Sequence, residues 1–122
     1  MSISAAESRI MEALWLRGPL IADEIVAEVA GPQGWTKATV KSLINRLLNK
    51  GVIQAEKAGR RYRYRPCADR SAYLSGESQG LLDRLFSGRV APLVSHFSKT
   101  GQLTPEDIAE LKRLITDLDN DH

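Results

Sequence analysis

A mainly α-helical fold with a small β-hairpin is predicted for this chain of 122 residues. Two observations predict it. Apolar residues recur at helical spacing in six segments. In one short stretch between the third and the fourth segment, tyrosines alternate with arginines at every second residue, as in a strand. Because the charge balance also changes near Pro66, we expect two domains, residues 1–67 and residues 68–122.

The first two helices are recognised by their ends. Ser4 and Glu7 form the S-x-x-E pattern of a capping box, and apolar residues follow at helical spacing until Gly18-Pro19. In the second helix, apolar residues repeat on one face from Ile21 to Val29. We expect Gly31-Pro32 to end this helix.

The third helix has the most regular pattern, WTKATVKSLINRLLNKG, with Thr36 as a cap and Gly51 after its end. Its apolar stripe consists of Val40, Leu43, Ile44, Leu47 and Leu48. At ~100° per residue, the opposite face carries Ala38, Ser42, Asn45 and Asn49, flanked by Thr39, Lys41 and Arg46. This face is polar, short-chained at its centre and basic at its edges.

Two strands follow, VIQAEKA and RRYRYRP, joined through Ala58-Gly59. Tyr62 and Tyr64 alternate with arginines, so we expect the tyrosines to form the packing face and the arginines to lie on the other. Pro66 cannot donate a ladder hydrogen bond and is expected to end the second strand. Of the hairpin arginines, Arg65 is expected to matter least because it lies farthest from the tip.

Residues 68–122 return to a helical pattern: an interrupted helix from Tyr73 to Phe86, a short one from Val90 to Phe97, and a last one capped by Thr104. Three amphipathic helices of about 50 residues bury little surface alone, so we expect them to pack across a twofold axis. Packing against the first domain is the alternative. The expected dimerisation residues are Leu81, Leu85, Leu93, Phe97, Ile108, Leu111, Leu114, Ile115 and Leu118.

Positive charge is concentrated in the first domain. Residues 1–67 contain eleven Lys and Arg against six Asp and Glu, a net charge of +5, whereas residues 68–122 contain six against nine, a net charge of −3. Within residues 36–66 nine basic residues face one acidic residue, Glu56. Such a concentration attracts polyanions.

Three helices followed by a basic hairpin is the order of a winged helix-turn-helix, whose third helix can enter the major groove of DNA. We therefore expect double-stranded DNA as the partner. The alternative is a winged-helix adaptor that binds proteins without specific DNA binding. The expected DNA-binding residues are Thr36, Lys37, Ala38, Thr39, Lys41, Ser42, Asn45, Arg46, Arg60, Arg61 and Arg63.

Other classes of function have little support in the sequence. No Gly-rich phosphate loop, H-E-x-x-H motif or nucleophile elbow occurs, so an enzyme is not expected. Cys67 is the single cysteine, and His96 and His122 are the two histidines of the chain. With so few potential ligands we expect no metal, and we expect no cofactor and no small-molecule ligand. No apolar run approaches the ~20 residues of a membrane span and no signal-peptide pattern is present, so a cytoplasmic location is expected.

The runs ESRIMEALW, WTKATVKSLINRLLNKGVI, YRYRP and LTPEDIAELKRLI resemble the penicillinase and methicillin-resistance repressors, the BlaI/MecI family, over nearly the whole chain. The resemblance implies a homodimeric repressor that binds a palindromic promoter operator of TACA/TGTA type. It places Thr39, Lys41 and Ser42 near bases, Thr36, Lys37 and Arg46 on phosphates, and Arg60, Arg61 and Arg63 on the wing.

Antibiotic-sensing members of this family are cleaved by a membrane sensor metalloprotease at an Asn-Phe bond in the dimerisation region. The matching pair here is His96-Phe97, in which His replaces Asn. The chain also departs from the family at Ala38, where a basic residue is frequent, and at Lys41, where Arg is frequent; Arg reads a base edge better in bidentate fashion. A copper-responsive branch carries a C-terminal Cys-x-Cys cluster, which one cysteine cannot supply.

Overall fold

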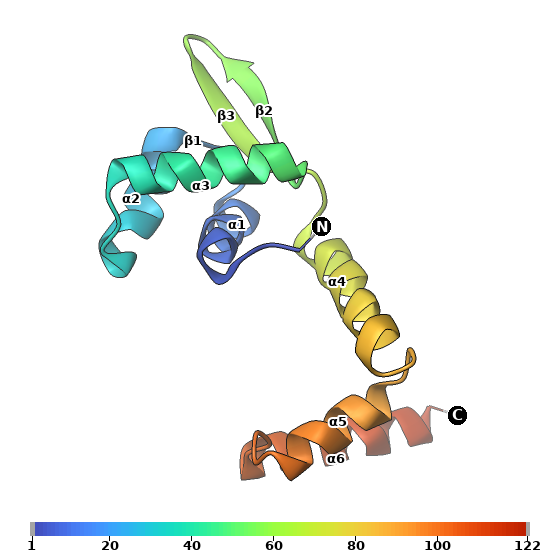
Figure 1. Ribbon diagram of the computed structural model, residues 1–122. Coiled ribbons are helices and arrows are strands. Elements are labelled where there is room, and N and C mark those ends of the chain that lie inside the picture. The colour runs from blue at the N-terminus through green and yellow to red at the C-terminus, as the bar shows by residue number, and fades with distance from the viewer. Residues whose placement is uncertain (1, 122) are drawn as a thin grey trace. The chain divides into compact units, whose positions relative to one another are not determined.

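Three helices and a small antiparallel sheet form the first part of the chain in the computed structural model, which describes residues 2–121. Figure 1 shows β2 and β3 as a hairpin that projects beyond α3. The mainly α-helical fold with a winged helix-turn-helix is confirmed. The elements are α1 (Ala5–Arg17), β1 (Leu20–Ile21), α2 (Ala22–Gln33), α3 (Lys37–Lys50), β2 (Ile53–Ala58) and β3 (Arg61–Pro66), and the strand order is β1-β3-β2.

The core of this part lies between the apolar faces of α1, α2 and α3, with one residue each from β1 and β2 closing it. The apolar stripe predicted for α3 is the stripe that is buried, except that Leu48 is only partly covered. Fully burying an aliphatic side chain contributes ~1.5–3 kcal/mol, so this core is the main source of stability. Its most buried members are Ile10, Met11, Leu14, Ile25, Val40, Ile44 and Leu47.

The second helix ends later than the sequence predicts. Instead of stopping at Gly31-Pro32, α2 continues to Gln33 and closes on Gly34, which has a left-handed backbone with φ 68°. The amide of Trp35 donates to the carbonyl of Ala30 at 2.9 Å, and the amide of Gly34 to that of Gly31 at 3.1 Å. This hydrogen-bond pattern satisfies the carbonyls of Ala30 and Gly31 in the last turn of the helix.

The sheet contains a strand that the sequence analysis missed. β1 is two residues long and pairs with β3, with Leu20 opposite Tyr64 and Ile21 opposite Arg63. It supports only the base of the hairpin, which explains why the two tyrosines differ. Tyr64 packs against the core, but Tyr62 is 51% exposed, so the prediction that both tyrosines pack is wrong for Tyr62.

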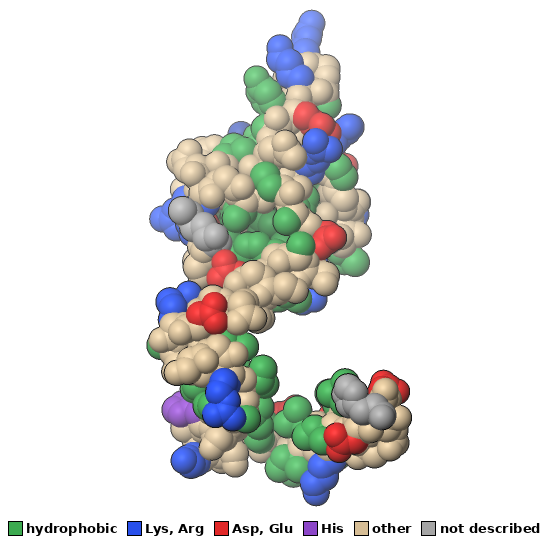
Figure 2. Space-filling model, turned by 90° about the vertical axis from the view of Figure 1, so that its right-hand side faces the viewer, with side chains coloured by type: hydrophobic (Ala, Val, Ile, Leu, Met, Phe, Trp, Pro, Cys, Tyr) green, Lys and Arg blue, Asp and Glu red, His purple; other side chains and the backbone are tan. Residues whose placement is uncertain are grey.

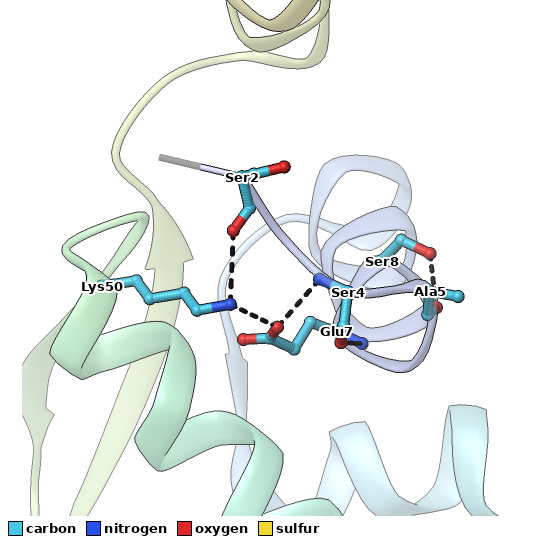
Figure 3. A network of polar contacts seen from close by, with 6 residues as sticks. All are labelled: Ser2, Ser4, Ala5, Glu7, Ser8 and Lys50. Carbon is cyan, nitrogen blue, oxygen red and sulfur yellow. Dashed lines mark hydrogen bonds and ion pairs between the residues drawn. The ribbon is translucent and has the colours of Figure 1, made fainter.

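A buried carboxylate joins the start of α1 to the end of α3 (Figure 3). Glu7 is 1% exposed, and its Oε1 accepts hydrogen bonds from the Ser4 amide at 2.9 Å and from Lys50 Nζ at 2.6 Å. Ser4 Oγ in turn accepts from the Glu7 amide at 3.0 Å, which completes the predicted capping box. Burial raises the pKa of Glu7, but the bonds from Lys50 and Ser4 outweigh burial and leave the pKa below its ordinary value.

The fourth helix, α4 (Arg70–Leu85), is continuous rather than interrupted. Its first turns belong to the winged-helix part. Trp15 Nε1 donates to the Ala68 carbonyl at 3.0 Å, the Trp15 and Tyr73 rings lie 5.5 Å apart, and Arg70 pairs with Glu12 at 3.1 Å. By these contacts the first compact unit of the chain extends to Glu77. The assignment of residues 1–67 to DNA binding and of residues 68–122 to dimerisation stays a prediction.

The second unit starts at Ser78 and contains the rest of α4 with α5 (Val90–Lys99) and α6 (Pro105–Asn120). The predicted cap of α6 is present, because Thr104 Oγ1 accepts from the Asp107 amide at 3.0 Å and the Asp107 carboxylate accepts from the Thr104 amide at 3.2 Å. Among the described residues of this unit, only Leu82 is a buried apolar side chain. The unit thus leaves most of its apolar surface uncovered.

Candidate nucleic-acid interface

The polar face of α3 is open to solvent. Its buried stripe of Val40, Leu43, Ile44 and Leu47 fixes the rotation of the helix about its axis, so the opposite face must point outward. The residues of α3 and its cap that are predicted to bind DNA are all exposed: Thr36, Lys37, Ala38, Thr39, Lys41, Ser42, Asn45 and Arg46.

Two caps set the length of this face. The hydroxyl of Thr36 accepts from the Thr39 amide at 3.2 Å and lies 3.1 Å from the Thr39 hydroxyl, and Gly51 closes the other end with φ 76°. The two threonine hydroxyls are therefore bonded locally. In this first half of α3, Lys41 and Ser42 carry exposed polar groups that can turn toward a ligand, and Lys37 makes an ion pair that is described below.

The hairpin brings the predicted wing arginines to its outer end. Arg60 lies at the turn beside Gly59, whose φ of 67° suits a residue without a side chain, and Arg61 and Arg63 follow on β3 with exposed side chains. Figure 2 shows Lys and Arg side chains gathered at the end of this hairpin. Arg65 is engaged nearer the base, where its Nε lies 3.9 Å from the Glu56 carboxylate.

An acidic residue that the sequence analysis did not single out lies between these two basic elements. Asp23, in the first turn of α2, pairs with Lys37 Nζ through Oδ1 at 3.2 Å and with Arg61 Nη1 through Oδ2 at 3.3 Å. The hydrogen bond from Lys37 and the charges of Lys37 and Arg61 lower the pKa of Asp23, so it is ionised at neutral pH. No local sequence pattern predicts this contact. It depends on the register between β1 and β3, and β1 is too short to be recognised in the sequence.

The same residues line a shallow hollow with a volume of about 290 Å³. Lys37 and Lys41 come to it from α3, Arg61 and Tyr62 from β3, and Asp23 from α2. The N-terminal half of α3 and the wing are thus parts of one surface, and this surface is basic apart from Asp23.

The residues predicted for dimerisation lie on the second unit, and most point outward. Leu85, Phe97, Ile108, Leu114, Ile115 and Leu118 are exposed, and Leu81, Leu93 and Leu111 are half-buried. Figure 2 shows hydrophobic side chains on the surface of this unit. His96 and Phe97, the candidate cleavage pair, lie in α5 with both side chains exposed, and the His96 ring lies 6.4 Å from that of Phe86.

Residues 2–121 contain neither a metal-binding cluster nor a membrane-spanning helix. No three His, Cys, Asp or Glu side chains within this range converge as metal ligands do, and His122 lies outside the described residues. None of the helices in the same range combines the length and the apolar character that crossing a membrane requires.

A winged helix-turn-helix with an exposed polar recognition helix and a basic wing defines a winged-helix regulator of transcription. The sequence model of the penicillinase repressor family matches residues 3–117, and the chain belongs to that family. The homologues in this family are transcriptional repressors rather than enzymes.

Two curated relatives and one solved structure illustrate the similarity. The chain is 30% identical to the penicillinase repressor of Bacillus licheniformis over 118 residues, which cover 97% of this chain and 92% of the relative. It is 26% identical to the methicillin resistance regulatory protein MecI of Mammaliicoccus sciuri over 113 residues, covering 93% of this chain and 92% of that protein. The solution structure of monomeric B. licheniformis BlaI in complex with the blaP half-operator has a TM-score of 0.54 and 30% identity, over 60% of this chain and 89% of that chain.

Proposed function

We propose that this protein is a homodimeric transcriptional repressor that binds a palindromic promoter operator of TACA/TGTA type. The observation that carries the proposal is the single basic surface formed by the exposed face of α3 and the wing, where Lys37, Lys41 and Arg61 line one hollow. The related BlaI, whose monomer was solved on a half-operator, supports DNA as the partner. The family model over residues 3–117 supports repression as the outcome.

Within this surface, position on the helix suggests a division of work. Thr39, Lys41 and Ser42 occupy the exposed face in the first half of α3, the part of a recognition helix that reaches base edges. Arg63 lies on the wing, where a guanidinium would bind phosphate or enter the minor groove. Base contacts specify the sequence and phosphate contacts fix the register.

A dimer is favoured by the second unit. Three helices with an apolar face that is largely exposed would gain stability by burying it against an identical unit, and a twofold dimer matches a palindrome. Exposed apolar positions of α6 that suit such a seam are Ile108, Ile115 and Leu118.

Relief of repression by proteolysis extends the proposal. Cleavage between His96 and Phe97 by a membrane sensor protease would separate α6 from the rest of the chain and so divide the dimerisation region. Both side chains are exposed near the C-terminal end of α5, so local opening of one helical turn would present the bond.

The experiment compares Lys41→Ala and Arg63→Ala in mobility-shift titrations on the protein's own promoter, a TACA/TGTA palindrome and an unrelated duplex, over a range of salt. Lys41→Ala is expected to cost about 1–3 kcal/mol on the operator and little on the unrelated duplex, because it removes a base contact. Arg63→Ala is expected to weaken both duplexes about equally and to reduce the salt slope by about one, because it removes a phosphate contact.

Binding of no duplex at low salt would reject the proposal and favour the protein-binding adaptor. An equal loss of preference in both variants would reject the division of work between helix and wing while leaving DNA binding in place.

A further inference from the structure

We propose that Asp23 is an internal competitor of DNA: in the free protein its carboxylate binds Lys37 and Arg61 as a backbone phosphate would, and it thereby lowers the affinity of the interface for every duplex. The inference rests on the proposed DNA-binding function. It concerns a residue outside the predicted interface, and it makes an acidic side chain part of the control of binding.

The geometry gives each cation its own carboxylate oxygen. Lys37 Nζ lies 3.2 Å from Oδ1 and Arg61 Nη1 lies 3.3 Å from Oδ2, so one carboxylate serves both the first residue of α3 and the wing. A phosphate group offers the same arrangement, with several oxygens that accept from separate donors. Lys41 lines the same hollow and adds a third positive charge near Asp23.

The fold explains why Asp23 is in this place. β1 and β3 pair antiparallel with Ile21 opposite Arg63, so the start of α2 lies beside the part of β3 that carries Arg61. At Ala22 the chain turns into α2, whose packing against α3 brings Asp23 beside Lys37. The pairing therefore follows from the backbone of three elements rather than from one flexible contact.

These pairs are weak enough for DNA to replace them. The side chains are 51% exposed for Asp23, 57% for Lys37 and 63% for Arg61, and exposed ion pairs contribute little to stability. To bind Lys37 and Arg61, DNA must nevertheless displace the Asp23 carboxylate, which stays ionised. The freed carboxylate then lies near phosphates of like charge. Both effects oppose binding irrespective of base sequence.

The test uses Asp23→Asn, which keeps the size of the side chain and removes its charge. We expect binding to the operator and to an unrelated duplex to tighten by about three- to tenfold at low salt. The salt dependence should become steeper by up to about one in log–log slope, because removing one negative charge leaves one more unit of positive charge to neutralise phosphate. At high salt the two proteins should converge.

The matched control is Glu28→Gln. It removes the same charge from the same helix, but Glu28 pairs with Arg17, which is not part of the interface. A second control repeats Asp23→Asn in a Lys37→Ala/Arg61→Ala background, where the gain should disappear if Asp23 acts through these two cations. Persistence of the whole gain in that background would overturn the proposal, since it would reflect general repulsion.

The same titrations separate this inference from the proposed function. If the wild-type protein binds no duplex, the proposed function fails and the inference fails with it. If the wild-type protein binds and Asp23→Asn binds no tighter than Glu28→Gln, only the inference is overturned.

Discussion

Glu7 shows how a buried charge can serve the fold at the scale of a single residue. Its carboxylate is almost fully removed from water, which by itself is unfavourable. It compensates by accepting from the Ser4 amide, which would otherwise be an unpaired donor at the start of α1, and from Lys50 in the last turn of α3. One side chain thus caps one helix and anchors the end of the recognition helix.

Replacing Glu7 with Gln should keep the capping hydrogen bond and lose the ion pair. We expect the free energy of unfolding at pH 7 to fall by about 1–3 kcal/mol, because Lys50 would be left partly buried without its counter-charge. The matched control is Glu12→Gln, which breaks an exposed pair with Arg70 and should cost about 0–1 kcal/mol. Denaturant unfolding followed by circular dichroism measures both.

The effect of Glu7 should also depend on pH with a defined sign. Its folded pKa lies below the ordinary value of 4.5, so its stabilising contribution is complete above that value and is lost as pH falls through the folded pKa. The difference in unfolding free energy between wild type and Glu7→Gln should therefore shrink as pH falls from 7 toward 3. A difference that is constant over this range would contradict a stabilising role for the ionised carboxylate.

At the scale of secondary-structure elements, two glycines mark the predicted and the observed end of α2: Gly31 is at the predicted end, and Gly34 caps the observed end. Gly34 needs its left-handed backbone with φ 68°, and an added methyl group there would meet nothing within 4 Å, so the cost is conformational alone. Gly31 lies within the helix directly before Pro32, and a methyl group there meets nothing within 4 Å from residues farther along the chain.

Gly34→Ala should therefore destabilise the protein by about 1 kcal/mol. Gly31→Ala should change the stability by less, because the gain of ~1 kcal/mol in helix propensity is offset by the clash of the new Cβ with Cδ of Pro32. Thermal unfolding of the two variants under the same conditions compares the two effects. If the helix ended at Gly31-Pro32, as the sequence pattern predicts, Gly31→Ala would be the more destabilising variant.

The elements differ in how well the sequence predicts them because they depend on different ranges of interaction. The caps at Ser4, Thr36 and Thr104 are local, and each is present in the structure. The end of α2 depends on backbone bonds made after Pro32, and β1 depends on pairing with a strand more than 40 residues later in the chain, so neither has a local signal. The candidate site follows the same rule: the exposed face of α3 is periodic and predictable, and Asp23 required the register of β1.

At the scale of the whole molecule, the chain consists of two units with opposite surface chemistry. The winged-helix unit has an apolar core and a basic outer surface, whereas the unit that begins at Ser78 has one buried apolar side chain among its described residues and many that are exposed. A protein that exposes large apolar side chains over several helices is suited to association. The proposed dimer would give that unit the core it lacks.

Leu118→Asp tests this arrangement without disturbing the fold of a single chain, because Leu118 is 61% exposed. We expect sedimentation to show a dimer weakened at least about tenfold, since two carboxylates would be placed at an apolar seam. Ala109→Asp, which puts the same charge on an exposed position of α6 away from the apolar stripe, should stay dimeric. Affinity for a half-site should be equal in the two variants, whereas affinity for the full palindrome should fall only in Leu118→Asp, because simultaneous binding of two linked domains is lost. A Leu118→Asp protein that remains dimeric would move the interface away from α6.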